Sequence, residues 1–346
     1  MVGSAHPREK EEWLIPKTIS VLLAVLLCAA LVAATAICLT LDGLWDTRCA
    51  EAPAQAPTQN ASQQATLPTE PLPQKPQSQV IFEDGTADFW AGCPDGIRIE
   101  TIRKQYFLAH VMLIRDPGAV YLTTSTDHFS LNHPGGRLPA QLKAEGALAA
   151  INAGAFNDDG TSSDYVGSLP IGMVVSEGEI LWDDGKNYYG FVGMTRENKL
   201  YVSDTINRAA VEELGIRDGC CFGPVLIKDG VSNTEKVHDR SVKNNRNSRT
   251  AIGQRGDGSV VFVCIDGRQV GSIGATFDEL LALMEELECV NACTLDGGAS
   301  TVMAYKDTEG RYGKAGEIVT CSSYSLFQAA PRRMPTFFMV RPGEED

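Results

Sequence analysis

Two aspartates with glycine neighbours are the residues of this chain best suited to chemistry. Asp266 follows the apolar run 260–265 and opens the sequence Asp-Gly-Arg. Asp296 follows a second apolar run, which ends at Leu295, and opens the sequence Asp-Gly-Gly-Ala-Ser-Thr. Glycine permits backbone conformations with positive φ and lets a ligand come close to the main chain. These two carboxylates are therefore the predicted catalytic pair.

Other polar or permissive positions repeat this arrangement at the ends of apolar runs. Those predicted to bind substrate are Asn152, Gly154, Gly297, Gly298, Ser300 and Thr301. Each motif alone is an ordinary turn, but the three motifs at Asn152, Asp266 and Asp296 together indicate one shared binding site. The Gly-Lys-Ser/Thr ending of a Walker loop is absent, so a nucleotide-type phosphate loop is not indicated.

Two arginines flank the same runs. Arg249 precedes the strand predicted at 250–253, and Arg268 directly follows Asp266-Gly267. A guanidinium can hold a phosphate through two parallel hydrogen bonds. The alternative for either side chain is a surface charge or a charge paired with a carboxylate.

The elements that must position these residues are a strand, a helix and a second strand. Thr276 followed by Glu279 predicts a capping box, and apolar residues from Phe277 to Leu287 recur at helical spacing. Strand, helix and strand in this order predict a parallel pair joined by a right-handed crossover. Asp266 and Asp296 would then end neighbouring strands on one rim, where open α/β sheets place their sites.

The region from 80 to 346 is predicted to form one α+β domain, a mixed β-sheet with a βαβ unit. Turn signals predict hairpins at 171–182 and 191–202, and Asp257-Gly258 predicts that 250–253 pairs with 260–265. Many short strands and few helices are typical of this class.

Cysteine and histidine do not form a recognisable centre. Of 10 cysteines, eight lie outside the long apolar N-terminal segment, and one or two structural disulfides are expected among them. No ligand spacing for zinc occurs, so no metal is predicted, with calcium bound by Asp and Asn oxygens left open. His110 falls within a predicted strand, and no Gly-x-Ser-x-Gly elbow exists to pair with a histidine.

The N-terminal part predicts an exported, anchored protein. Residues 18–41 carry no charge and are long enough to span a bilayer, while Arg8, Lys10 and Lys17 precede them. The prediction is a cytoplasmic tail at 1–17, a transmembrane helix or signal anchor at 18–41, and a disordered Pro/Gln-rich linker at 42–79. A cleaved signal peptide is the alternative. The net charge of −14 argues against nucleic acid as a partner.

Several stretches together resemble the phosphodiester glycosidase family. They run from about 147 to 340 and comprise Ile151-Asn152-Ala153-Gly154-Ala155-Phe156-Asn157, Leu169-Pro170-Ile171-Gly172, Phe222-Gly223-Pro224-Val225, Arg249-Thr250-Ala251-Ile252-Gly253, Asp266-Gly267-Arg268, Leu295-Asp296-Gly297-Gly298-Ala299-Ser300-Thr301 and Arg333-Met334-Pro335-Thr336. Each motif is weak alone, but their order and spacing are specific.

The resemblance implies hydrolysis of a sugar-1-phosphodiester. Asp296 would be the carboxylate nearest the anomeric carbon, and Asp266 its partner or a ligand of the sugar hydroxyls. Asn152 would bind substrate, while Arg249, Arg268 and the Gly297-Gly298 turn would hold the phosphate.

The function expected from anchor and resemblance is a membrane-anchored extracytoplasmic glycosidase acting on envelope or exopolysaccharide phosphodiesters, with N-acetylglucosamine-1-phosphodiester as one candidate substrate. The alternative from another class is a non-catalytic exported module that binds glycan or cell wall. A deep cleft holding both aspartates and an arginine would favour the enzyme, and a shallow aromatic groove would favour the binder. A metal-dependent phosphodiesterase is disfavoured by the lack of histidine ligands.

Overall fold

The structure, a computed structural model, describes residues 89–131, 133–157, 167–186, 190–238, 245–311, 314–322 and 331–343. All of them lie in the unit Pro73–Asp346. The predicted tail, transmembrane segment and linker at 1–79 lie outside the described residues. Among the helices that are described, none is long and apolar enough to cross a membrane.

The largest sheet carries both predicted catalytic aspartates at strand ends. Its seven strands follow the order β1–β2–β15–β14–β16–β12–β13. They are β1 (Ile97–Arg103), β2 (Leu108–Ile114), β15 (Val260–Ile265), β14 (Arg249–Arg255), β16 (Cys289–Leu295), β12 (Val225–Lys228) and β13 (Val231–Ser232). β15 is an uninterrupted apolar run because both of its faces are buried.

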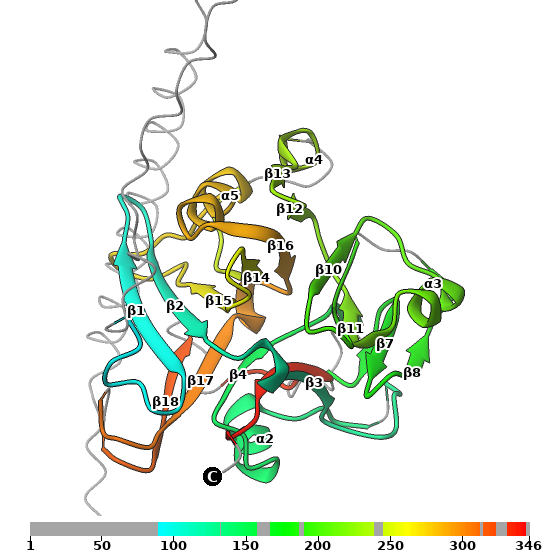
Figure 1. Ribbon diagram of the computed structural model, residues 1–346, viewed down its shortest axis with the longest axis horizontal. Coiled ribbons are helices and arrows are strands. Elements are labelled where there is room, and N and C mark those ends of the chain that lie inside the picture. The colour runs from blue at the N-terminus through cyan, green and yellow to red at the C-terminus, as the bar shows by residue number, and fades with distance from the viewer. Residues whose placement is uncertain are drawn as a thin grey trace, which may run out of the picture. The chain divides into compact units, whose positions relative to one another are not determined.

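Two five-stranded sheets pack beside the first (Figure 1). One has the order β10–β9–β11–β7–β8, with β10 (Leu200–Ser203), β9 (Phe191–Thr195), β11 (Ile216–Cys221), β7 (Met173–Ser176) and β8 (Glu179–Asp183). The other has the order β18–β17–β4–β19–β3, with β18 (Glu317–Ser322), β17 (Val302–Asp307), β4 (Ala149–Asn152), β19 (Thr336–Val340) and β3 (Val120–Thr124). β5 (Phe156–Asn157) pairs antiparallel with β6 (Leu169–Pro170) in a separate two-stranded sheet.

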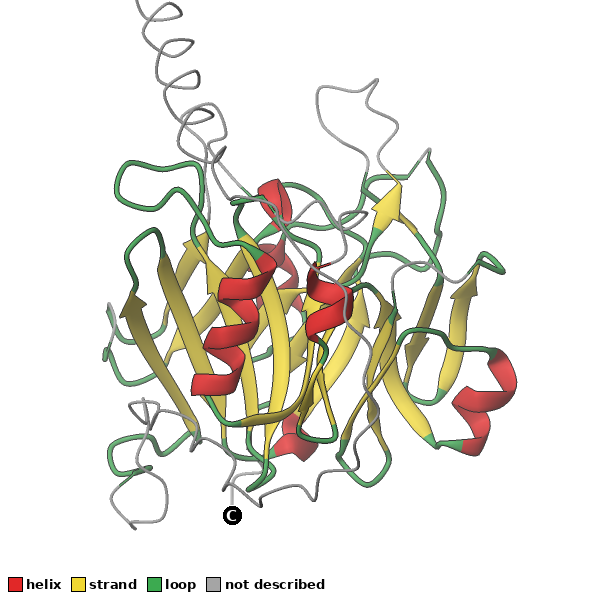
Figure 2. Ribbon diagram, turned by 90° about the horizontal axis from the view of Figure 1, so that it is seen from above, coloured by secondary structure: helices red, strands yellow, loops and turns green. Residues whose placement is uncertain are grey.

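Short helices cover the outer faces of the sheets (Figure 2). They are α2 (Leu138–Ala144), α3 (Arg208–Glu213), α4 (Thr234–His238) and α5 (Phe277–Glu286). α5 buries Leu280 and Met284 against the seven-stranded sheet, in one cluster with Val261 and Val263 of β15. Its N-terminus carries the predicted capping box between Thr276 and Glu279.

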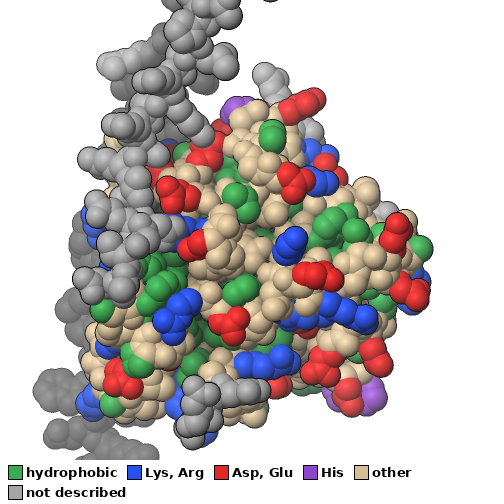
Figure 3. All heavy atoms as spheres, viewed as in Figure 1, with side chains coloured by type: hydrophobic (Ala, Val, Ile, Leu, Met, Phe, Trp, Pro, Cys, Tyr) green, Lys and Arg blue, Asp and Glu red, His purple; other side chains and the backbone are tan. Residues whose placement is uncertain are grey.

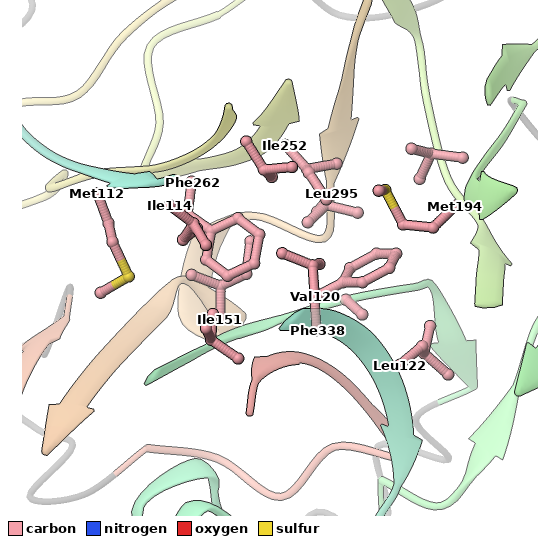
Figure 4. Packing of buried hydrophobic residues seen from close by; sticks show 14 of the residues in the cluster. Met112, Ile114, Val120, Leu122, Ile151, Met194, Ile252, Phe262, Leu295 and Phe338 are labelled. Carbon is pink, nitrogen blue, oxygen red and sulfur yellow. The ribbon is translucent and has the colours of Figure 1, made fainter. Parts of the chain in front are cut away.

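The central core lies between the inner faces of the three sheets. Figure 4 shows Ile252, Phe262 and Leu295 of the largest sheet facing Ile151 and Phe338 of the third sheet. Each of these five side chains is at most 1% exposed. Burial of a large apolar side chain contributes about 1.5–3 kcal/mol, so this layer fixes the strand ends that carry the site.

The α+β class and the sheet-rich build agree with the sequence, but the predicted parallel pair needs correction. β14 lies between β15 and β16 and is antiparallel to both. β15 and β16 therefore run parallel to each other without being hydrogen-bonded neighbours. The crossover predicts that β15 and β16 are direct neighbours. Instead β14, the hairpin partner of β15, lies between them.

The expected disulfides are not found among the described cysteines. Six are buried free thiols, namely Cys93, Cys220, Cys221, Cys264, Cys289 and Cys293. Burial raises the pKa of Cys289 to about 12, so this thiol stays protonated. These six cysteines therefore act as small core residues.

Candidate active site

The predicted site residues lie at one end of the neighbouring strands β15, β14 and β16 of the seven-stranded sheet, and this end is called the edge. In the strand registers Arg249 lies opposite Ile265, and Thr250 lies opposite Leu295. Asp266 and Asp296, each one residue further on, thus lie at the same edge as Arg249. Because β14 separates β15 from β16, two strand spacings place the two aspartate backbones about 10 Å apart. A direct parallel pair would have placed them about 5 Å apart.

Asp266 has the environment of a binding or catalytic group. Its side chain is 11% exposed, and its Oδ2 lies 3.2 Å from Nε2 of His110. Its buried Oδ1 has no hydrogen-bond partner among the described residues. The main chain is fixed on both sides, since Asp266 N donates to Leu108 O and Ser272 Oγ donates to Asp266 O. An unsatisfied buried acceptor costs about 1–3 kcal/mol, and a bound hydroxyl or water would remove that cost.

His110 is the member of the site that the sequence did not identify. It lies on β2, whose register places it opposite Cys264, two residues before Asp266. The sequence shows one polar residue within the apolar run 108–114, which is the available signal. Its partner could not be read from the sequence because β2 and β15 are about 150 residues apart, and only the sheet order brings them together.

Asn152 holds the backbone of Asp296 through its buried side chain. It is fully buried, and its Nδ2 donates to the backbone oxygen of Asp296 at 2.6 Å. Its Oδ1 accepts hydrogen bonds from Thr250 Oγ1 at 2.9 Å and from Val302 N at 3.1 Å. Thr301 Oγ1 lies 3.3 Å from the same Thr250 hydroxyl. Asn152 and Thr301 therefore belong to the buried hydrogen bonds that hold the backbone of the site in place.

The glycines after Asp296 form a tight turn over Ser248. Gly298 has φ 62°, and its N–H donates to Ser248 O at 2.9 Å. A Cβ on Gly297 would lie 2.8 Å from the same oxygen, so a side chain does not fit there. The Gly297 N–H has no acceptor among the described residues and remains available to a ligand. Ser300 is buried, and its hydroxyl has no partner either.

Gly154 serves packing behind this turn. A Cβ there would lie 2.9 Å from Cys220 Cβ. Its N–H donates to Thr336 Oγ1 at 3.1 Å.

The two arginines have different surroundings. Arg249 is buried, and its Nε and Nη2 donate to Ala275 O at 3.0 Å and to Asn245 O at 2.5 Å. Its guanidinium lies 3.7 Å from the Phe277 ring centroid, and no carboxylate among the described residues pairs with it. Burial lowers the pKa of Arg249 to about 10, so the side chain is a desolvated cation at neutral pH.

Arg268 is exposed, and no described residue forms a hydrogen bond or ion pair with its side chain. Its backbone has φ 58°, a left-handed conformation that glycine would adopt more easily. The edge thus offers one fixed and one free guanidinium.

No group of three or more His, Cys, Asp or Glu side chains suited to a metal ion occurs in the described part of the chain. The calcium alternative remains a prediction.

Comparison with known proteins gives a family match and a fold. Residues 145–341 match the family model described as phosphodiester glycosidase. The SPbeta prophage-derived uncharacterized protein YomE of Bacillus subtilis (strain 168) is 29% identical over 202 residues. That match covers 57% of this chain and 28% of YomE, so the chain spans less than a third of that relative.

Two solved structures are similar at low sequence identity. The zebrafish N-acetylglucosamine-1-phosphodiester alpha-N-acetylglucosaminidase catalytic domain, auto-inhibited by its pro-peptide, has a TM-score of 0.55 at 16% identity, covering 71% of this chain and 82% of that one. A hypothetical protein from Synechocystis has a TM-score of 0.53 at 17% identity, covering 71% and 62%. At these identities the likeness establishes the fold alone.

Proposed function

The chain belongs to the phosphodiester glycosidase family, and we propose that it hydrolyses a sugar-1-phosphodiester at the edge formed by β15, β14 and β16. The observation that carries the proposal is the presence, two residues apart, of a buried Asp266 oxygen and an Arg268 guanidinium that have no partner among the described residues. The first can bind a hydroxyl or water, and the second can bind a phosphate.

In the proposed reaction, water attacks the anomeric carbon and the bond from that carbon to the phosphate oxygen breaks. The bonding electrons leave with the phosphomonoester, and the proton of the water passes to a carboxylate. Asp296 faces the anomeric carbon and stabilises its positive charge, while Asp266 orients water or a sugar hydroxyl through Oδ1. His110, on Oδ2, fixes the orientation of the Asp266 carboxylate.

A phosphate leaving group needs little protonation but carries negative charge as it departs. Arg268 and the Gly297 N–H are the groups proposed to bind that charge directly. Arg249 adds a positive electrostatic field from its buried position and holds the segment before α5 through its hydrogen bond to Ala275 O. Donors fixed in advance at such a position typically accelerate a reaction by about 10²–10³.

The test is an assay of the purified full-length protein against a panel of sugar-1-phosphodiesters, with free sugar and phosphomonoester measured together. N-acetylglucosamine is the first sugar to include, because the zebrafish protein is named for it. Asp296→Asn and Asp266→Asn should each abolish release of sugar, whereas Asp229→Asn should not. Asp229 lies in the exposed β12–β13 turn with φ 50°, which asparagine tolerates. Full activity in either active-site variant would contradict the proposal.

The location proposed for this activity is the outer surface of a membrane, on envelope or exopolysaccharide diesters. It is supported by the uncharged segment 18–41 and the Pro/Gln-rich segment 42–79 of the sequence. Anchor and spacer would hold the domain within reach of surface polymers.

One observation favours the rival function, a glycan-binding module. A cavity of about 570 Å³ is lined by Asp127, His128, Phe129, Ser130, His133, Leu181 and Trp182. Phe129 and Trp182 pack edge to face there, with ring centroids 5.8 Å apart. Aromatic faces beside polar groups are typical of sugar-binding sites. Glycan binding that Trp182→Ala abolishes, in a wild-type protein without turnover on the whole panel, would favour this function.

A further inference from the structure

The loop between β15 and α5 presents apolar side chains to solvent beside the proposed phosphate site. Gln269 and Ser272 exchange two backbone hydrogen bonds of 3.1 Å, which close a turn with Val270 and Gly271 at its tip. Val270 is 106% exposed relative to its reference state, and Ile273 is 52% exposed. A solvent-facing turn tip is ordinarily occupied by Gly, Asn, Asp or Ser, so a bare valine there is unusual.

The neighbouring connection between β1 and β2 carries a further partly exposed ring, one face of which is covered by Arg246. Ile273 N donates to Tyr106 O at 2.9 Å, and Tyr106 is itself 39% exposed. Val270, Ile273 and Tyr106 are called the apolar patch below. A single exposed apolar residue needs no explanation, but three that belong to adjoining segments next to a site do.

This patch is held rigidly relative to Asp266. Ser272 Oγ donates to Asp266 O at 2.7 Å and accepts from Leu108 N at 3.0 Å. Arg103 Nη1 donates to Gly271 O at 3.4 Å. A fixed surface can contribute binding energy without first being ordered, which is the advantage of a preorganised site.

The order of groups along the loop corresponds to the order of groups in a lipid-like phosphodiester. Asp266 provides the carboxylate, Arg268 the free cation, and Val270 the apolar tip. Val270 lies four residues beyond Asp266, so their Cα atoms are at most about 14 Å apart. A phosphate followed by a few methylene groups fits within that limit.

The charges around the patch suit one phosphodiester anion. Arg246 stacks 3.9 Å over the Tyr106 ring, but its charge is taken up by two hydrogen bonds of 2.6 and 2.7 Å to Glu279. Arg268 has no such carboxylate partner in the described part of the chain.

We propose, on the basis of the function proposed above, that the alcohol esterified to the phosphate is hydrophobic and binds the apolar patch while the phosphate binds Arg268. The substrate class is then a sugar-1-phosphate diester of a lipid-like alcohol. The sugar lies toward Asp266, and the alkyl chain lies over Val270, Ile273 and Tyr106.

The experiment compares two substrates with the same sugar-1-phosphate, one a methyl diester and one an octyl diester below its critical micelle concentration. The full-length wild type should have a kcat/KM about tenfold higher or more for the octyl diester, the scale of hydrophobic discrimination by a binding site. In the double variant Val270→Ser with Ile273→Ser, the ratio of the two kcat/KM values should fall to about 1. Val231→Ser is the matched control, because Val231 is 70% exposed on β13, away from the site, and its ratio should match the wild type.

Three outcomes would overturn the proposal. If the wild-type kcat/KM values for the octyl and methyl diesters are about equal, the alkyl site is excluded while the proposed hydrolysis still holds. An octyl preference that appears only above the critical micelle concentration assigns the patch to an aggregate or membrane surface instead. Hydrolysis of neither diester, nor of any panel member, overturns the proposed function and this inference with it.

Discussion

Arg268 combines a left-handed backbone conformation with an exposed charge that no described residue pairs with. A residue other than glycine at φ 58° costs about 1 kcal/mol relative to glycine. No described residue forms a hydrogen bond or ion pair with the side chain that would offset this cost. We therefore expect the charge of the Arg268 guanidinium to have a function in binding substrate.

Replacing Arg268 by glycine separates stability from function. Arg268→Gly should leave the free energy of unfolding unchanged or raise it by up to about 1 kcal/mol, and should lower kcat/KM at least about tenfold. Urea denaturation and the diester assay measure the two quantities. Asp229→Gly, at φ 50°, should gain similar stability with no loss of activity. A fully active Arg268→Gly enzyme would exclude this guanidinium from phosphate binding.

Asn152 illustrates how the structure alters the role expected from sequence. The sequence predicts a substrate ligand, whereas three hydrogen bonds place its side chain between Thr250, Val302 and Asp296. Asn152→Ala leaves these buried groups without partners, so we expect the free energy of unfolding to fall by about 2–4 kcal/mol. A variant with wild-type stability in urea but without activity would instead return Asn152 to direct substrate binding.

Helix α5 holds Arg246 and Arg249, which lie just before and at the start of β14. Phe277 in its first turn supports the Arg249 guanidinium, and Glu279 accepts two hydrogen bonds from Arg246. Burial alone would raise the pKa of Glu279, but hydrogen bonds from Arg246 and Thr276 outweigh it and hold that pKa below 4.5. A carboxyl whose pKa is lowered on folding stabilises the protein above its unfolded pKa.

The pH dependence of stability therefore tests this element. The contribution of Glu279 should be complete above about pH 4.5 and should be lost as the pH falls through its lower folded-state value. Glu279→Gln should unfold at lower urea concentration than wild type at pH 6, and the difference should shrink toward pH 3. A difference that stays constant over this range would show that the charge of Glu279 does not contribute.

The elements also show what the sequence can and cannot determine. The capping box, the helix and the strand 260–265 were predicted because local pattern determines them. The rim shared by Asp266 and Asp296 was predicted because strand direction follows from the intervening helix. The insertion of β14 between the two strands, and the approach of His110 from β2, depend on long-range pairing that no local pattern encodes.

Acidic and basic side chains are interspersed on the face of the molecule shown in Figure 3. With a net charge of −14, the chain offers a phosphate few sites, and the edge with Arg249 and Arg268 is the one we propose. The same negative charge would oppose general adhesion to anionic surface polymers, which favours recognition at one site.

The proposed topology is tested on intact cells that produce the full chain. Protease added from outside should cut within 42–79 and release an active soluble domain, since this Pro/Gln-rich segment cannot bury a core. Immunoblotting of the supernatant and the diester assay would detect the released domain. A domain that resists protease until the cells are lysed would contradict an outward-facing location.

Hydrolysis in water labelled with ¹⁸O would show whether the sugar-1-phosphodiester is cleaved at its glycosidic bond. Mass spectrometry of both products shows which bond is broken. Attack at the anomeric carbon predicts the label in the sugar and none in the phosphomonoester, with turnover lost in Asp296→Asn and Asp266→Asn. Label in the phosphomonoester would show attack at phosphorus and would contradict the account.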